Sequence, residues 1–492
     1  MQRFQMYIDG KFSDAASGEW FETQNPYTGK TWALVARGGA PDAERAVEAA
    51  HRAFTSPDWR KLTATQRGAL LRKLGDLVAE RAEEFAEYEV RDNGKLIAEM
   101  AVQLRYVPQW YYYYGGLADK IEGSVIPIDK PGVFNYTLHE PLGVCLAIVP
   151  WNSPLLLTSF KIAPALAAGN TVIIKPSEFT STSVLEFVKL FEQAGFPPGV
   201  VNVVTGFGAE VGQPLVEHPL VRKVAFTGSE RTGQKVNEMA APGFKKVGLE
   251  LGGKSPNIVF ADANLDNAVK GAVAGIFAAT GQTCIAGSRL LVQEQIHNQF
   301  VDRLVDFAKG ARMGNPMEMD TQVGPVTTPP QYQKVLDYIG IASAEGAELR
   351  LGGRPAQRPE CGEGWFVEPT IFTGVDNRMR IAQEEVFGPV LSVIPFTDDD
   401  QAIAIGNDVA YGLAAGVWTQ DITRAHRMAK ELQAGTVWIN TYRAISFTSP
   451  FGGYKRSGMG RENGQDMIRD YLQTKSVWVD MNAEFPNPFA MR

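Results

Sequence analysis

The sequence predicts an α/β protein with more than one domain, and three observations lead to this prediction. The chain has 492 residues, which is too long for one ordinary domain. From Val144 onward, short apolar runs alternate with helical stretches, as in βαβ units that build a parallel sheet. Hydrophobic residues make up 45% of the chain and charged residues 21%, which excludes a disordered chain.

The first part of the chain reads as helical. A proline suited to a first helical turn opens a run from Pro41 to Phe54, and a longer amphipathic stretch covers Thr65 to Arg91 before the Asn93-Gly94 stop signal. The period then changes to two at Phe134, Tyr136 and Leu138, which predicts an exposed strand or hairpin that serves assembly.

Two series of strands follow. The first comprises residues 144–149, 171–174, 200–204 and 221–226, and the second comprises 257–260, 290–292, 390–394, 415–418 and 436–439. We therefore expect two α/β domains, with the boundary near Glu250 and Leu251.

Composition narrows the class of protein. The net charge is −7, and no run of Lys or Arg indicates a surface for nucleic acid or for a membrane. We expect a cytoplasmic protein, because the amino terminus lacks the apolar core of a signal peptide and no run approaches a membrane span. Three cysteines do not suit a disulfide framework, and the five histidines form no close ligand pair, so no metal site is expected.

The strongest chemical signal is Cys284, in the turn Gly281-Gln282-Thr283-Cys284-Ile285-Ala286-Gly287. Upstream lies Glu250-Leu251-Gly252-Gly253-Lys254, whose glycines allow close backbone approach. A thiol in a small turn and a glycine-flanked carboxylate suit covalent cysteine catalysis with a base that activates water. Cys145, in a buried strand pattern, and Cys361, in a loop, are expected to be small buried side chains.

Further polar residues follow predicted strands, where α/β sheets present ligands. Asn152 follows the strand that ends at Val149, and Lys175 and Glu178 follow the next strand, where they suit the hydroxyls of a ribose. Gly228, Ser229 and Gly233 combine a glycine turn with a serine cap at a helix start, which predicts an anion site.

Together with Pro150-Trp151-Asn152, Lys175-Pro176-Ser177-Glu178, Phe226-Thr227-Gly228-Ser229 and Glu385-Val386-Phe387-Gly388-Pro389, these motifs resemble the NAD(P)-dependent aldehyde dehydrogenase superfamily over nearly the whole chain. The resemblance implies an aldehyde dehydrogenase-like fold. It assigns residues 1–118 and 141–250 to a Rossmann-type NAD-binding domain and 251–465 to an α/β catalytic domain. Residues 119–140 and 466–492 would form a small β element for oligomerisation as a homodimer or homotetramer.

The same resemblance implies the roles of individual residues. Cys284 would be the nucleophile, Glu250 the base that activates the deacylating water, and Asn152 an oxyanion donor with the backbone N–H of Cys284. The cofactor contacts would be Ile148, Trp151, Lys175, Glu178, Gly228, Ser229, Gly233, Leu251, Glu385 and Phe387. The expected cofactor is NAD, because Glu178 would repel a 2′-phosphate, with NADP as an alternative acceptor.

The substrate is a small aldehyde of unspecified class. Ser153 stands where relatives often have phenylalanine, which predicts a wider or more polar tunnel wall. One alternative is a semialdehyde dehydrogenase for a charged substrate, with Arg105, Arg289 and Arg443 as candidates for a cationic mouth. Another is a non-catalytic member of the fold. The aromatic run from Trp110 to Tyr114 suits either helix packing or a substrate wall.

Overall fold

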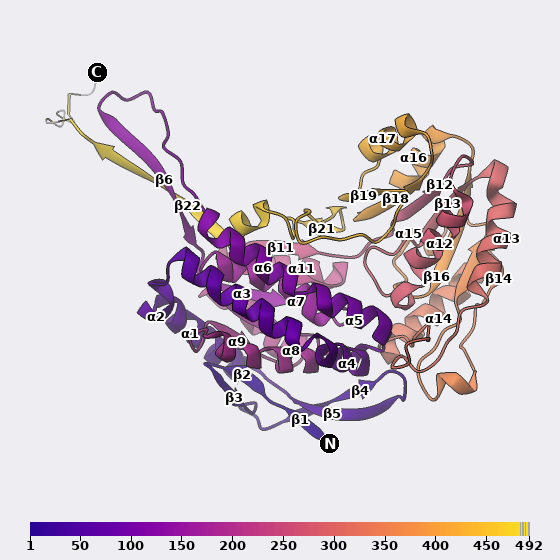
Figure 1. The fold of residues 1–492 in the computed structure, drawn as a ribbon, viewed down its shortest axis with the longest axis horizontal. Helices are drawn as coiled ribbons and strands as arrows, with labels where there is room; N and C mark the ends of the chain where they lie inside the picture. The colour runs from indigo at the N-terminus through magenta and orange to yellow at the C-terminus, as the bar shows by residue number, and fades with distance from the viewer. Residues whose placement is uncertain (483, 485–486, 488, 491–492) are drawn as a thin grey trace.

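Two sheets of mostly parallel strands form the body of the protein, and the computed structural model describes residues 1–482, 484, 487, 489 and 490. The first sheet has eight strands and the second has seven. They occupy opposite halves of the molecule, with the purple helices over the first sheet and the orange elements around the second (Figure 1). The prediction of an α/β fold with parallel sheets is confirmed.

The first sheet has the order β21-β11-β10-β7-β8-β9-β2-β3. Its parallel strands are β7 (Val144–Ile148), β8 (Thr171–Lys175), β9 (Val201–Val203), β10 (Val221–Thr227) and β11 (Lys246–Glu250). The chain runs from β7 through β8 to β9 and then returns to β10 on the other side of β7. The carboxyl ends of β7 and β10 therefore border a topological switch point, where open α/β sheets bind ligands.

Helices cover both faces of this sheet. They are α1 (Ala40–Thr55), α2 (Pro57–Arg60), α3 (Ala64–Glu80), α4 (Ala82–Asn93), α5 (Ile97–Tyr106), α6 (Pro108–Leu117), α7 (Pro154–Ala167), α8 (Thr182–Phe187), α9 (Lys189–Ala194), α10 (Gln213–Glu217) and α11 (Glu230–Ala240). The expected helix from Thr65 to Arg91 is wrong as a single element, because Arg81 leaves helical geometry at φ −112°, ψ 14°. The break lets α4 turn Phe85 into the core, edge to face with Phe187.

The second sheet has the order β14-β15-β16-β13-β12-β18-β19. Its strands are β12 (Pro256–Val259), β13 (Arg289–Gln293), β14 (Glu348–Leu351), β15 (Thr370–Thr373), β16 (Val390–Phe396), β18 (Ala414–Trp418) and β19 (Thr436–Ile439). Around it lie α12 (Leu265–Ile276), α13 (His297–Ala308), α14 (Pro329–Ala344), α15 (Arg380–Gln383), α16 (Asp399–Asn407) and α17 (Ile422–Glu431). Every described helix is too short or too polar to cross a membrane.

Five strands precede the first helix, in a part of the chain that the sequence patterns did not resolve. They are β1 (Gln2–Phe4), β2 (Met6–Ile8), β3 (Lys11–Ser13), β4 (Trp20–Asn25) and β5 (Lys30–Ala36). The turn between β2 and β3 is Asp9-Gly10, with both residues at positive φ. Asp-Gly is a strong hairpin signal, so this pair of strands could have been found from the sequence.

The expected exposed strand near Phe134 is confirmed as β6 (Val133–Pro141), which pairs antiparallel with β22 (Leu472–Asp480). The two form a ribbon that projects from the body (Figure 1). Two short pairings involve the segment that follows the second sheet. Strand β17 (Tyr411–Gly412) pairs with β20 (Tyr454–Lys455), and β21 (Gly458–Met459) joins the first sheet beside Glu250. Of the predicted segment 466–492, residues 483, 485–486, 488 and 491–492 lie outside the described residues.

Candidate active site

A cavity of about 130 Å³ lies where the carboxyl ends of β7, β10 and β11 face the segments that lead into β12, β13 and β16. Most of the predicted site residues meet there. Those that line it are Trp151, Asn152, Gly228, Ser229, Glu250, Leu251, Cys284, Glu385 and Phe387. They come from segments far apart in the sequence, so only the fold brings them together.

Cys284 is half-buried in the loop before β13, and this loop is conformationally strained. Ala279 and Thr280 both have positive φ, at 52° and 54°. Strain of this kind persists only where neighbours hold the backbone in place, and it is common at functional sites. Burial raises the pKa of the Cys284 thiol, and the charges of Glu385 and Glu250 raise it further. The thiol therefore needs a proton acceptor before it can act as a nucleophile.

Glycines allow the surrounding loops to approach Cys284. A Cβ on Gly253 would lie 2.5 Å from the carbonyl oxygen of Cys284, and one on Gly252 would lie 2.5 Å from the Glu385 carboxylate. A Cβ on Gly281 would lie 2.0 Å from the carbonyl oxygen of Gly388. The motif from Glu250 to Lys254, the turn that contains Cys284 and the motif from Glu385 to Pro389 therefore pack closely against one another at these glycines.

Asn152 is buried in the loop between β7 and α7, and its side chain is fixed against the cysteine loop. Its Nδ2 donates to the carbonyl oxygen of Gln282 at 2.9 Å. Gln282 is itself held, because its Oε1 accepts from the backbone N–H of Thr327 at 2.9 Å. The amide of Asn152 retains a second N–H beside Cys284, the donor that an oxyanion would need.

Glu250 ends β11 and is buried, with Oε2 lacking a hydrogen-bond partner among the described residues. Burial raises the pKa of this carboxyl well above its usual value, and the charge of Glu462 raises it further. The charges of Lys161 and Arg461 oppose this rise. A buried carboxyl with an unused oxygen suits a base that meets a water molecule only during turnover.

Sequence reasoning did not find the buried pair behind Glu250. Lys161 of α7 forms an ion pair with Glu462 and donates to Thr227 Oγ1 at 2.5 Å. The side chain of Lys161 is fully buried. The sequence did contain a signal for this pair, because Lys161 is the one charged residue in the helix from Pro154 to Ala167. A lysine is almost never fully buried without a partner.

The segment before β16 lies on the other side of the cavity. Glu385 Oε1 accepts from the backbone N–H of Gly253 at 3.0 Å, and burial raises the pKa of Glu385. The ring of Phe387, a residue with φ 59°, stands edge to face against Trp151 with ring centroids 5.2 Å apart. These contacts connect the Trp151-Asn152 loop, the Gly252-Gly253 turn and the Glu385 segment into one wall.

The remaining predicted cofactor contacts, Ile148, Lys175, Glu178 and Gly233, do not line this cavity. Ile148 ends β7 and pairs in register with Lys175, whose Nζ lies 3.8 Å from Glu178 Oε2. Ser229 Oγ caps α11 by accepting from the backbone N–H of Thr232 at 3.3 Å. Gly233 lets α11 pack against Leu251, because a Cβ there would lie 2.4 Å from the leucine side chain.

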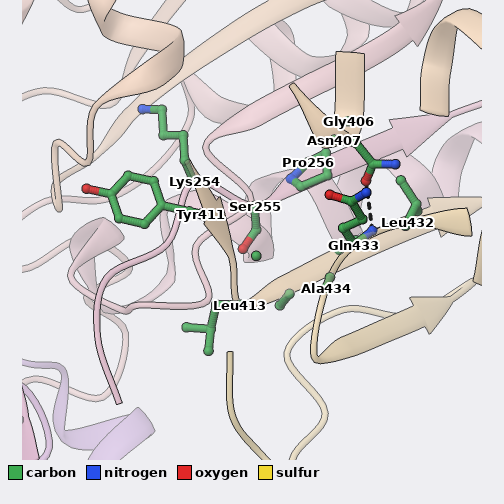
Figure 2. A pocket seen from close by; sticks show the side chains of 13 residues that line it. Lys254, Ser255, Pro256, Gly406, Asn407, Tyr411, Leu413, Leu432, Gln433 and Ala434 are labelled. Carbon is green, nitrogen blue, oxygen red and sulfur yellow. Dashed lines mark hydrogen bonds between the residues drawn. The ribbon is translucent and has the colours of Figure 1, made fainter. Parts of the chain in front are cut away.

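A second, smaller space lies beside the second sheet, and none of the predicted site residues lines it (Figure 2). Its lining includes Lys254, Ser255 and Gln433, and its volume of about 10 Å³ is that of a single water site. Asn407 Oδ1 accepts from the backbone N–H of Gln433 at 2.7 Å, while the Lys254 side chain extends away from this bond (Figure 2).

None of the three arginines named as candidates under the alternative of a charged substrate lines the cavity at Cys284. Arg105 pairs on the surface with Glu83 at 2.7 Å. Arg289 is buried in β13 and donates to the carbonyl oxygens of Lys254, Ile405 and Gly406. Arg443 donates to the carbonyl oxygen of Ala274. The three arginines come from α5, β13 and the loop after β19. Their spacing along the sequence could not show whether they lie close together.

The aromatic run from Trp110 to Tyr114 packs α6 against the core. Trp110, Tyr111 and Tyr114 of α6 are fully buried, and Trp110 stacks on Phe160 at 5.0 Å. Cys145 and Cys361 are buried and free, as expected. Among the described residues, no group of three or more His, Cys, Asp or Glu side chains could hold a metal ion.

The sequence profile described as the aldehyde dehydrogenase family matches residues 12–477. The chain belongs to the aldehyde dehydrogenase family. This aldehyde dehydrogenase is 48% identical over the full length of both chains to the (Z)-2-((N-methylformamido)methylene)-5-hydroxybutyrolactone dehydrogenase of Acinetobacter baylyi. Its fold superposes on betaine aldehyde dehydrogenase from Staphylococcus aureus in complex with NAD⁺ with a TM-score of 0.97, at 41% identity and with 99% of this chain and 97% of the other covered. PnpE from Pseudomonas sp. WBC-3 gives 0.96 at 46% identity, with both chains fully covered.

Proposed function

We propose that this aldehyde dehydrogenase oxidises an aldehyde to the carboxylic acid with NAD as acceptor, and that Cys284 is its nucleophile. The observation that carries the proposal is the convergence of Cys284, Asn152 and Glu250 on one cavity. A thiol, an amide donor and a base at one point are the groups that acyl transfer through a thioester requires.

The residues around the cavity fit a dinucleotide. The cavity reaches the capped start of α11 at Gly228 and Ser229, where backbone N–H groups favour a pyrophosphate. Beyond it, Lys175 and Glu178 at the end of β8 would hold the adenosine ribose, and Glu385 the nicotinamide ribose, beside Phe387 and Trp151. We assign Ile148, Gly233 and Leu251 to shaping this surface. When bound, NAD accepts a hydride from the substrate carbon. The related Staphylococcus aureus structure contains NAD⁺.

The first half of the reaction belongs to Cys284 and Asn152. The Cys284 thiol gives its proton to water, and its sulfur forms a bond to the aldehyde carbon, which gives a thiohemiacetal. Asn152 Nδ2 and the backbone N–H of Cys284 hold the oxygen as negative charge develops on it. Loss of one such donor typically costs about 2.7–4 kcal/mol of transition-state stabilisation. Departure of hydride from the same carbon leaves a thioester on Cys284.

Glu250 carries the second half. Its carboxylate takes a proton from water, the hydroxide attacks the thioester, and the carbon–sulfur bond breaks to release the acid and restore Cys284. Burial and the charge of Glu462 raise the pKa of Glu250 well above its usual value, which makes its carboxylate a stronger base toward water. The carboxyl also favours transfer of the acyl group to water rather than to coenzyme A, because activation of water requires a base.

Two variants test this mechanism. Cys284→Ala should abolish NADH formation with every aldehyde, since no other described side chain offers a thiol at the cavity. Glu250→Gln should stop turnover after the oxidation, so that an acyl group accumulates on Cys284 and appears in the intact mass. Normal turnover by Cys284→Ala would exclude the mechanism, and undiminished steady-state turnover without acyl-enzyme would exclude the role of Glu250.

We also propose the division into an NAD-binding domain (1–118 and 141–250), a catalytic domain (251–465) and an oligomerisation element (119–140 and 466–492). The two separate sheets support the first two, although β21 of the catalytic segment pairs with β11. The ribbon of β6 and β22 exposes Phe134, Leu138, Trp478 and Val479, which supports a homodimer or homotetramer. Three free cysteines fit a reducing cytoplasm.

A further inference from the structure

A buried polar cluster lies beside the cysteine loop but outside the cavity described above. Its centre is Lys95, at the corner between α4 and α5, which is 4% exposed. Lys95 Nζ donates to Ser153 Oγ at 2.7 Å and forms no ion pair among the described residues. An ammonium has three donors, so two N–H groups of Lys95 have no acceptor there. A buried cation with spare donors is costly unless another group satisfies it.

Side chains from the next helix extend this cluster. Glu99 and Gln103 are four residues apart on α5 and share one face of it. Gln103 Oε1 accepts from Ser153 Oγ at 3.4 Å, while Gln103 Nε2 is buried and has no partner in the described part of the chain. Glu99 Oε2 is likewise buried and unpartnered. The cluster thus offers donors from Lys95 and Gln103 and one acceptor from Glu99.

The cluster contacts the loop that carries the nucleophile. Glu99 Oε1 accepts from the backbone N–H of Ala279 at 2.9 Å, five residues before Cys284. Ser153 directly follows Asn152, whose side chain binds the carbonyl of Gln282. Thr283, next to Cys284, has a buried Oγ1 that finds no hydrogen-bond partner among the residues that the structure describes. The cluster therefore borders Cys284 through both the oxyanion donor and the cysteine turn.

The cavity at the end of the first sheet is lined by none of Lys95, Glu99, Gln103, Ser153 and Thr283. If the dinucleotide fills that cavity, the aldehyde has to reach Cys284 from another side. The buried donors and acceptors of the cluster come from the α5 side, and none of them lines the cavity assigned to the dinucleotide. Burial lowers the pKa of Lys95 to about 8, so Lys95 remains mainly a cation at neutral pH.

We propose that Lys95, Gln103 and Ser153 form a polar substrate subsite, and that the preferred substrates are aldehydes with a second oxygen acceptor, such as a hydroxyl, carbonyl or carboxylate. The inference rests on the proposed oxidation at Cys284 and specifies its substrate class. Unbranched alkyl aldehydes would leave the spare donors of Lys95 and Gln103 unsatisfied in the bound state, which a polar site rejects strongly.

The test compares matched pairs of aldehydes that differ by an oxygen substituent: lactaldehyde and 3-hydroxypropanal against propanal, and succinic semialdehyde against butanal. We expect the wild type to prefer at least one oxygenated member about tenfold or more in kcat/KM. Gln103→Leu and Lys95→Met should each reduce that preference about tenfold or more, mainly through KM, while propanal and butanal lose little. The pair that responds identifies a hydroxyl or a carboxylate as the recognised group.

Gln213→Leu, an exposed change on α10, is the matched control and should leave the preference unchanged. Gln103→Leu keeps the proposal testable even if Lys95→Met fails to fold, because Gln103 is only half-buried. Equal kcat/KM for every pair in the wild type would overturn the subsite, as would equal losses for all substrates in Gln103→Leu. A wild type that oxidises no aldehyde would instead overturn the proposed function.

Discussion

The ion pair between Lys161 and Glu462 leads to a quantitative prediction about the pH dependence of thioester hydrolysis by Glu250. Glu462 raises the pKa of Glu250, and Lys161 lowers it. Glu462→Gln removes the negative charge and leaves Lys161 without its partner, so both changes lower the pKa of Glu250. A single charged neighbour within about 4–6 Å shifts a carboxyl pKa by about 1–3 units.

The sign of the effect follows from the role of Glu250 as a base. Only its carboxylate form accepts a proton from water, so hydrolysis rises with pH through the pKa of Glu250. In Glu462→Gln this rise should move to lower pH by about 1–3 units. Each unit corresponds to about 1.36 kcal/mol of differential interaction with the carboxylate. The unpaired Lys161 should also reduce the free energy of unfolding by roughly 3–5 kcal/mol.

The assay is a single turnover with excess NAD, in which decay of the acyl-enzyme is followed by quenched intact mass at a series of pH values. Lys161→Met combined with Glu462→Gln removes both charges and should shift the profile less than Glu462→Gln alone. Glu217→Gln, an exposed change on α10, should leave it in place. A profile that stays in place or moves to higher pH in Glu462→Gln would refute the reasoning.

Three further predictions concern the cofactor, the cysteine loop and assembly. Glu178→Gln should lower the KM for NADP on the order of tenfold by removing a like charge from the 2′-phosphate, with an unchanged KM counting against this placement. Gly281→Ala should reduce the free energy of unfolding by roughly 2 kcal/mol or more in urea titration, because Gly281 has φ 70° and its Cβ would meet the Gly388 carbonyl. Gly340→Ala, in open space on α14, should instead raise the free energy of unfolding by about 0.5–1 kcal/mol. A similar change in both variants would contradict the strain expected in Gly281→Ala. Trp478→Glu, which charges an exposed side chain of the ribbon, should reduce the proposed homodimer or homotetramer to smaller species in sedimentation, whereas an unchanged mass would exclude the ribbon from the proposed interface.

Local patterns were sufficient for most of the parallel strands, although β11 and β15 were missed, and for both ends of α1. The runs at residues 144–149 and 171–174 are mostly apolar because both faces of each strand are covered, and such a run can be detected without knowing what the strand packs against. Short strands at the amino terminus lack that signal, since β1, β2 and β3 contain three residues each. The break at Arg81 was also missed, because it depends on where Phe85 packs.

The sequence by itself determined the α/β class, most of the parallel strands, the family and the motifs that contain Cys284, Glu250 and Asn152. It could do so because each motif is a local run whose glycines and strand ends are set by neighbouring residues. Only the tertiary structure decided which charges lie beside these motifs. It placed Glu462 against Lys161 across 301 residues, put Lys95 beside Ser153 across 58, and separated Arg289 from the candidate site. Such pairings depend on packing between distant segments, and nothing in the local sequence specifies them.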